Sequence, residues 1–105
     1  MDKNAVYKVI TAFRMALQAE GIQAEKVILF GSYATDRFRE DSDIDIAVIS
    51  RDFQNKSYWE RIDILSNAIY RVLEPIEASA FTPEEWQRED SIIVDFAKNG
   101  VVVYG

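Results

Sequence analysis

Two carboxylates one residue apart are the feature of this sequence that most directly indicates chemistry. Asp43 and Asp45 flank Ile44 in the stretch DSDIDIAV, whose remaining residues are typical of a buried strand. Alternate residues of a strand point to the same face of the sheet, so the two carboxylates would lie together and repel each other. Hard divalent cations prefer oxygen ligands, and Mg²⁺ is commonly shared between carboxylates and phosphates. The pair therefore predicts a magnesium site that also recruits a triphosphate.

An alternative places Asp43 in a solvated turn at the start of the strand, together with Asp41 and Ser42. Aspartate and serine favour turns, so this alternative explains Asp43 well. It explains Asp45 poorly, because aspartate is disfavoured inside strands.

Gly31 and Ser32 form a candidate phosphate-binding turn between an expected strand and a short helix. Glycine lets the backbone approach a ligand closely, and the N–H groups at a helix N-terminus attract phosphate. The Ser32 hydroxyl would add one more donor. Taken alone, the dipeptide is more often an ordinary turn with a serine N-cap, and that alternative stays open.

The elements that must position these residues follow from the apolar pattern. Four apolar, β-branched runs predict strands at residues 26–30, 44–49, 76–81 and 101–104. Helical spacing predicts helices at residues 3–20 and 58–73. Thr82 would begin a third helix as N-cap of a capping box with Glu85, and Asp90 would cap a last helix that ends at Asn99-Gly100. This alternation predicts an α/β class, with a mixed sheet flanked by helices.

Composition narrows the function classes. The 105 residues match one domain, residues 1–105, and the net charge of −6 makes nucleic acid an unlikely partner. The chain has no cysteine and no histidine, which removes thiolate chemistry, Ser-His triads and most zinc sites. No signal pattern or membrane-length apolar run is present, so we expect a cytoplasmic protein without a membrane partner.

The two motifs in combination are more specific than either alone. Gly31-Ser32, ten residues, then Asp43-Ile44-Asp45 resembles the signature of the polymerase-β-like nucleotidyltransferase superfamily. The chain length and the form FGSYA…DSDIDIAV resemble its minimal nucleotidyltransferase branch. The resemblance implies that the Gly31-Ser32 turn holds the triphosphate of ATP and that the aspartates bind two Mg²⁺ ions.

The resemblance also assigns a third acid. Two-metal transfer usually needs one further carboxylate, and the family pattern places it on the strand after the long helix, where Glu77 stands. Many relatives have aspartate there, and many carry a basic residue and then glycine where this chain has Thr35-Asp36. A solvent-facing position on an edge strand is an equally good interpretation of Glu77.

The function implied by the resemblance is transfer of AMP from ATP to a hydroxyl, with release of pyrophosphate. Asp43, Asp45 and Glu77 would be the catalytic and metal-binding residues. Relatives of this size are commonly paired with a helical HEPN-domain toxin, so the chain would act as the antitoxin by modifying a toxin hydroxyl, with tyrosine as the expected acceptor. Because the chain is too short to hold a separate acceptor domain, we expect the partner to supply that surface. Two alternatives remain: an inactive module that neutralises its partner by binding, and a nucleotidyltransferase for small molecules.

Overall fold

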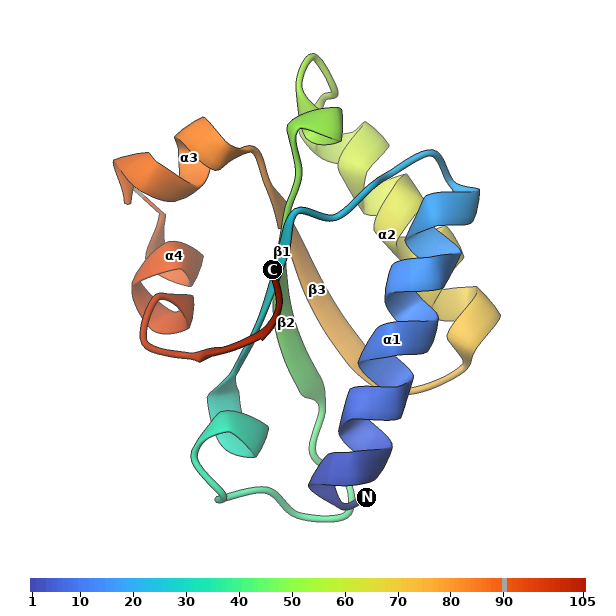
Figure 1. Cartoon of the computed structure of the whole chain (residues 1–105), viewed down its shortest axis with the longest axis vertical. Coiled ribbons are helices and arrows are strands. Elements are labelled where there is room, and N and C mark those ends of the chain that lie inside the picture. Colours follow the sequence, from blue (N-terminus) through green and yellow to red (C-terminus); the bar gives the residue numbers. More distant parts are fainter. Residues whose placement is uncertain (90) are drawn as a thin grey trace.

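Alternating helices and strands make up the computed structural model, which describes residues 1–89 and 91–105 (Figure 1). In chain order the elements are α1 (Lys3–Ala19), β1 (Lys26–Phe30), the 3₁₀ helix η1 (Gly31–Ala34), β2 (Ile44–Ile49), the 3₁₀ helix η2 (Arg51–Phe53), α2 (Tyr58–Val72), β3 (Ile76–Phe81), α3 (Pro83–Arg88), α4 (Ile92–Ala97) and β4 (Val101–Tyr104). The predicted α/β class and all four predicted strands are confirmed.

The four strands form one sheet in the order β3-β2-β1-β4. Strand β1 runs antiparallel to both of its neighbours, whereas β2 and β3 are parallel. Helices α1 and α2 cover one face of the sheet, and α3 and α4 cover the other (Figure 1). The face under α1 and α2 carries the larger core, in which α1 buries Val6, Ile10, Phe13 and Leu17.

Local capping fixes where the helices begin. The Asp2 carboxylate accepts a hydrogen bond from Ala5 N–H at 2.8 Å, as its position before α1 predicts. Thr82 and Glu85 form the predicted capping box of α3. A second capping box, Ser57 with Glu60, begins α2.

Helix ends depart slightly from the prediction. Helix α2 ends at Val72, because Leu73 adopts the left-handed conformation at φ 59°. The predicted cap Asp90 lies outside the described residues, and the N-cap of α4 is Ser91, whose hydroxyl accepts a hydrogen bond from Ile93 N–H at 3.2 Å. Helix α4 ends at Ala97, short of Asn99-Gly100. No helix in the described part of the chain has the length and apolar character needed to cross a membrane.

Candidate active site

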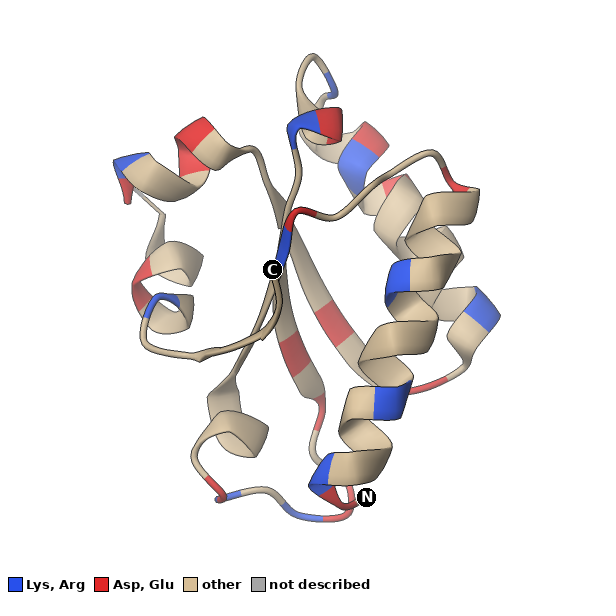
Figure 2. Cartoon of the chain, viewed as in Figure 1, with Lys and Arg blue, Asp and Glu red and all other residues tan. Residues whose placement is uncertain are grey.

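The parallel pairing of β2 with β3 brings two of the three predicted acids together. Asp45 lies opposite Glu77 in the register of these strands, and Phe30 of β1 lies on its other side. The acidic positions of β2 and β3 are side by side in Figure 2. The Glu77 carboxyl adjoins that of Asp45 and helps to raise its pKa. Asp45 is half-buried, whereas Glu77 is exposed.

Asp43 lies beside this pair and not within the strand. Strand β2 begins at Ile44, and the preceding segment is a turn in which the Ser42 hydroxyl accepts a hydrogen bond from Arg39 N–H at 2.8 Å. Asp43 therefore immediately precedes β2, and of the two interpretations of the Asp43-Asp45 pair the turn alternative describes the backbone of Asp43 better. The Asp43 charge still acts on Asp45.

Asp45 is in an environment that opposes its ionisation. Burial of its carboxyl raises its pKa from the ordinary value of 3.8 to about 6, assisted by the adjoining Glu77 carboxyl and by the charge of Asp43. The ion pairs found among residues 1–89 and 91–105 include none of these three acids. Within the described part of the chain, no positively charged side chain therefore compensates the three acids by an ion pair.

These acids suit a hard cation by their chemistry. They are all oxygen ligands, and the raised pKa of Asp45 shows that the pair would gain from a positive charge, which Mg²⁺ can supply. Among the described residues, however, no three acids already converge in a metal-holding arrangement. The assignment of two Mg²⁺ ions to Asp43, Asp45 and Glu77 stays a prediction.

The Gly31-Ser32 turn lies directly against Asp45. Gly31 begins η1 at φ +74°, a left-handed conformation that favours glycine, and a Cβ atom built on it would overlap Asp45 Oδ2. Two constraints therefore favour glycine at position 31: the left-handed backbone and the space taken by the Asp45 carboxylate. Its role in phosphate binding, with Ser32, stays a prediction, but the turn and the acid pair form one continuous site.

Two residues next to the Gly31-Ser32 turn, Tyr33 and Asp36, make contacts that stabilise the fold. Tyr33, which could have stacked on a nucleotide base, is buried and stacks on Phe38 with ring centroids 4.6 Å apart. Asp36 adopts the left-handed conformation at φ 60°, which aspartate tolerates better than most residues. Its carboxylate lies 2.7 Å from the Lys3 ammonium group, so the departure at Thr35-Asp36 adds an ion pair to α1.

A cavity of about 350 Å³ opens next to the acid pair, lined by Asp45, Glu77 and Ser79 among others. It continues into a cavity of about 690 Å³ whose far end carries Arg61. From the sequence, scattered surface charge is the preferred interpretation of the basic residues around 51–61, with contact to a ligand as the alternative. The Arg61 side chain is nevertheless only 16% exposed, and its guanidinium lies 2.6 Å from the Glu85 carboxylate. No local pattern could have revealed this contact, because the partners are 24 positions apart.

Comparisons with known proteins identify the family of this chain. The nucleotidyltransferase domain family matches residues 10–103, nearly the whole chain. A protein from Sulfolobus solfataricus assigned as a nucleotidyltransferase, with a crystal structure at 1.40 Å resolution, superposes with a TM-score of 0.59. It is 21% identical over 97% of this chain and 87% of its own, which bears on the fold alone. No protein of curated function matches the chain. The family match nevertheless covers both motifs and all three acids, and the chain belongs to the nucleotidyltransferase domain family.

Proposed function

We propose that this protein transfers AMP from ATP to a hydroxyl of a partner protein, with Mg²⁺ held by Asp43, Asp45 and Glu77. The observation that carries the proposal is the Asp45–Glu77 pair, which forms no ion pair with any described residue, adjoins the Gly31-Ser32 turn and opens into a cavity. A structural acid pair would be stabilised by a neighbouring cation. An acid pair left without one, in a cleft, is typical of a functional site.

The chain's own residues have distinct roles in the proposed step. The acceptor oxygen forms a bond to the α-phosphorus of ATP, and the bond from that phosphorus to the oxygen bridging to the β-phosphate breaks. Pyrophosphate leaves with the electron pair, and Glu77 takes the hydroxyl proton. Gly31 and Ser32 hold the phosphates, and Asp43 and Asp45 hold the metal. Mg²⁺, when bound, supplies positive charge to the attacking and leaving oxygens.

The partner implied by the resemblance is a helical HEPN-domain toxin, for which this chain would be the antitoxin, and a tyrosine is the proposed acceptor. The test is to incubate the protein with Mg·ATP and a co-expressed HEPN-domain partner, and then to measure the intact mass of the partner. A gain equal to one AMP, absent with Asp45→Asn, is the expected result. Neutralisation of the partner without any mass gain would support the inactive binding module instead.

Nucleotide binding provides a second, independent measurement. Calorimetry should show that Asp43→Asn and Asp45→Asn both weaken the binding of Mg·ATP, because each variant removes one negative charge from the proposed metal site. Unchanged affinity in both folded variants would remove the metal site from the proposal.

A further inference from the structure

Strand β3 has one edge that no other described strand covers. It is last in the order of the sheet and pairs with β2 alone. Ile44 N–H donates to Pro75 C=O at 2.8 Å, and Ser50 N–H donates to Phe81 C=O at 2.9 Å. These two hydrogen bonds show which peptide groups of β3 face β2. Alternate peptide groups of a strand point to opposite edges. The N–H and C=O groups of Ala78 and Ala80 therefore point away from β2.

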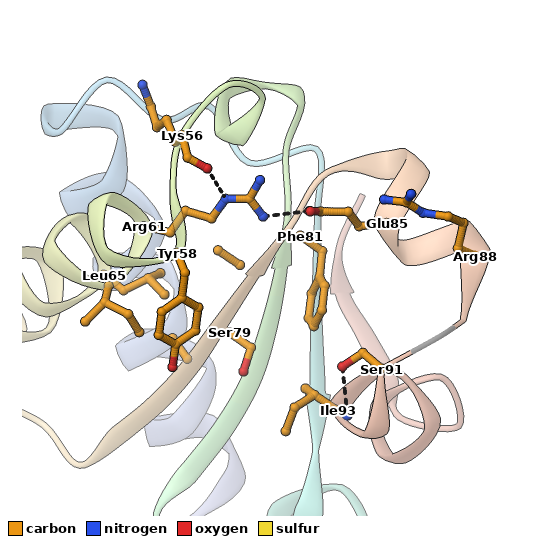
Figure 3. A pocket seen from close by; sticks show the side chains of 13 residues that line it. Lys56, Tyr58, Arg61, Leu65, Ser79, Phe81, Glu85, Arg88, Ser91 and Ile93 are labelled. Carbon is orange, nitrogen blue, oxygen red and sulfur yellow. Dashed lines mark hydrogen bonds and ion pairs between the residues drawn. The ribbon is translucent and has the colours of Figure 1, made fainter.

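A groove follows this edge. The cavities of about 690 Å³ and 350 Å³ share Ala78, Ser79 and Ile93, so they form one groove between α2 on one side and α3 and α4 on the other (Figure 3). Its acidic end contains Asp45 and Glu77. The small side chains of Ala78, Ser79 and Ala80 leave room for another backbone to approach β3.

The opposite end of the groove is basic. Lys56, Arg61 and Arg88 line it, with Glu85 as the acid among the described lining residues. Arg61 is held in place by the Glu85 carboxylate at 2.6 Å and by the Lys56 carbonyl at 3.2 Å (Figure 3). Lys56 forms no ion pair with any described residue. This local excess of cations contrasts with the net charge of −6 and selects for a negatively charged occupant.

The two ends are one strand length apart. Glu77 and Phe81 are separated by four positions of β3, which corresponds to about 13 Å at about 3.3 Å per residue. An extended polypeptide added to the free edge would advance by the same amount per residue. A residue placed at the acid pair would therefore be about four residues from a residue placed at Lys56 and Arg61.

We propose that this groove binds an extended, acidic segment of the protein acceptor, which pairs with the free edge of β3 and places its hydroxyl at Asp45 and Glu77. The proposal rests on the proposed function and adds to it the kind of acceptor. The acceptor residue lies in a segment able to form a strand, with aspartate or glutamate about four residues away.

The test is peptide binding measured by fluorescence anisotropy, without ATP or magnesium. The probe is a labelled peptide of about ten β-forming residues, with a tyrosine and a glutamate about four residues to each side of it. A matched peptide carries glutamine at both positions. We expect the unmodified protein to bind the glutamate peptide about tenfold more tightly, which corresponds to about 1.4 kcal/mol.

Two variants locate the interaction. Lys56→Glu should abolish the preference for glutamate, whereas Lys8→Glu, an equal change in charge on an exposed position of α1, should retain it. Ala80→Pro removes an outward N–H without touching the ladder to β2, so it should weaken binding of both peptides at least tenfold. Thermal unfolding of each variant checks that the fold persists.

Other outcomes would overturn the groove assignment. Equal effects of Lys56→Glu and Lys8→Glu, or equal binding of both peptides to the unmodified protein, would contradict it. Weaker ATP binding in Lys56→Glu, with peptide binding unchanged, would assign the basic end to the nucleotide. Selective peptide binding without AMP transfer to any partner would leave the groove in place and remove the proposed function, so the two failures are distinguishable.

Discussion

Asp45 and Glu85 are both partly buried acids along the same groove, and their surroundings act on them in opposite directions. Burial raises the pKa of Asp45, and two neighbouring acids raise it further, to about 6. Burial also raises the pKa of Glu85, but hydrogen bonds from the Arg61 guanidinium and the Thr82 N–H outweigh it, and the net pKa is lowered. Glu85 therefore has the environment of an acid that stabilises the fold, whereas Asp45 has the environment of an acid that would bind a ligand.

The largest expected effect is a loss of catalysis on substitution of Glu77, which pairs with Asp45. Glu77→Gln keeps the shape of the side chain but cannot take a proton or hold a metal, so transfer to the partner should fall by ~10²-fold or more. Asp43, Asp45 and the turn remain, so ATP binding should be partly retained. Intact mass of the partner over time is the measurement, and equal rates for both proteins would show that Glu77 is only a surface residue.

The contact of Gly31 with Asp45 gives the largest expected effect on stability. Gly31→Ala should lower the free energy of unfolding by about 3 kcal/mol, of which ~1–2 kcal/mol is the cost of the left-handed backbone and the rest is overlap with the carboxylate. Gly21→Ala is the matched control, because Gly21 is also left-handed, at φ +86°, but a Cβ there meets nothing within 4 Å. Urea unfolding of the two variants measures the difference, and equal losses would mean that the overlap is relieved at no cost.

A smaller effect is expected at the structural acid. Glu85→Gln breaks the ion pair with Arg61 and weakens the capping box of α3, so unfolding should become easier by about 1–2 kcal/mol. Glu84→Gln, on the exposed neighbour, should change stability by less than about 0.5 kcal/mol. If Glu85→Gln is as stable as the parent, Glu85 is not a stabilising acid and the contrast with Asp45 is wrong.

The smallest expected effect is the pH dependence that Asp45 imposes. Its pKa is higher in the folded state than in the unfolded chain, so its contribution is fully present below pH 4 and is lost as the pH rises through about 6. Without metal, Asp45→Asn should therefore be more stable than the parent at pH 7, on the order of 1 kcal/mol after allowance for solvent screening, and not at pH 4. Urea unfolding across this range measures it, and a difference that does not vary with pH would contradict the assigned environment.

The elements of the fold were predictable because local rules determine them. All four strands have the predicted bounds, since β-branched runs between turn residues leave little alternative. The caps at Asp2 and Thr82 follow from side chains that satisfy nearby N–H groups. The end of α2 was missed by one residue, because leucine is an unusual choice for the left-handed position that Leu73 occupies.

The site was predictable only in part, because it depends on pairing across strands. The spacing of Asp43 and Asp45 indicated an acidic cluster, and the predicted bounds of the strand already placed Asp43 just before β2. The resemblance identified Glu77, and the parallel register that places it opposite Asp45 could not be derived from the sequence. For the basic residues around 51–61, scattered surface charge was preferred over contact with a ligand, because the packing of α2 and α3 that brings Arg61 to Glu85 could not be derived from the sequence.

The close approach of Gly31 to Asp45 also bears on how such sequences can diverge. A side chain at position 31 and a carboxylate at position 45 would compete for the same space, so a single substitution at either position affects both. We expect homologues that replace the glycine to have lost the acid as well, and the two positions to change together. Inspecting these two positions would then distinguish descendants that have abandoned catalysis from those that retain it.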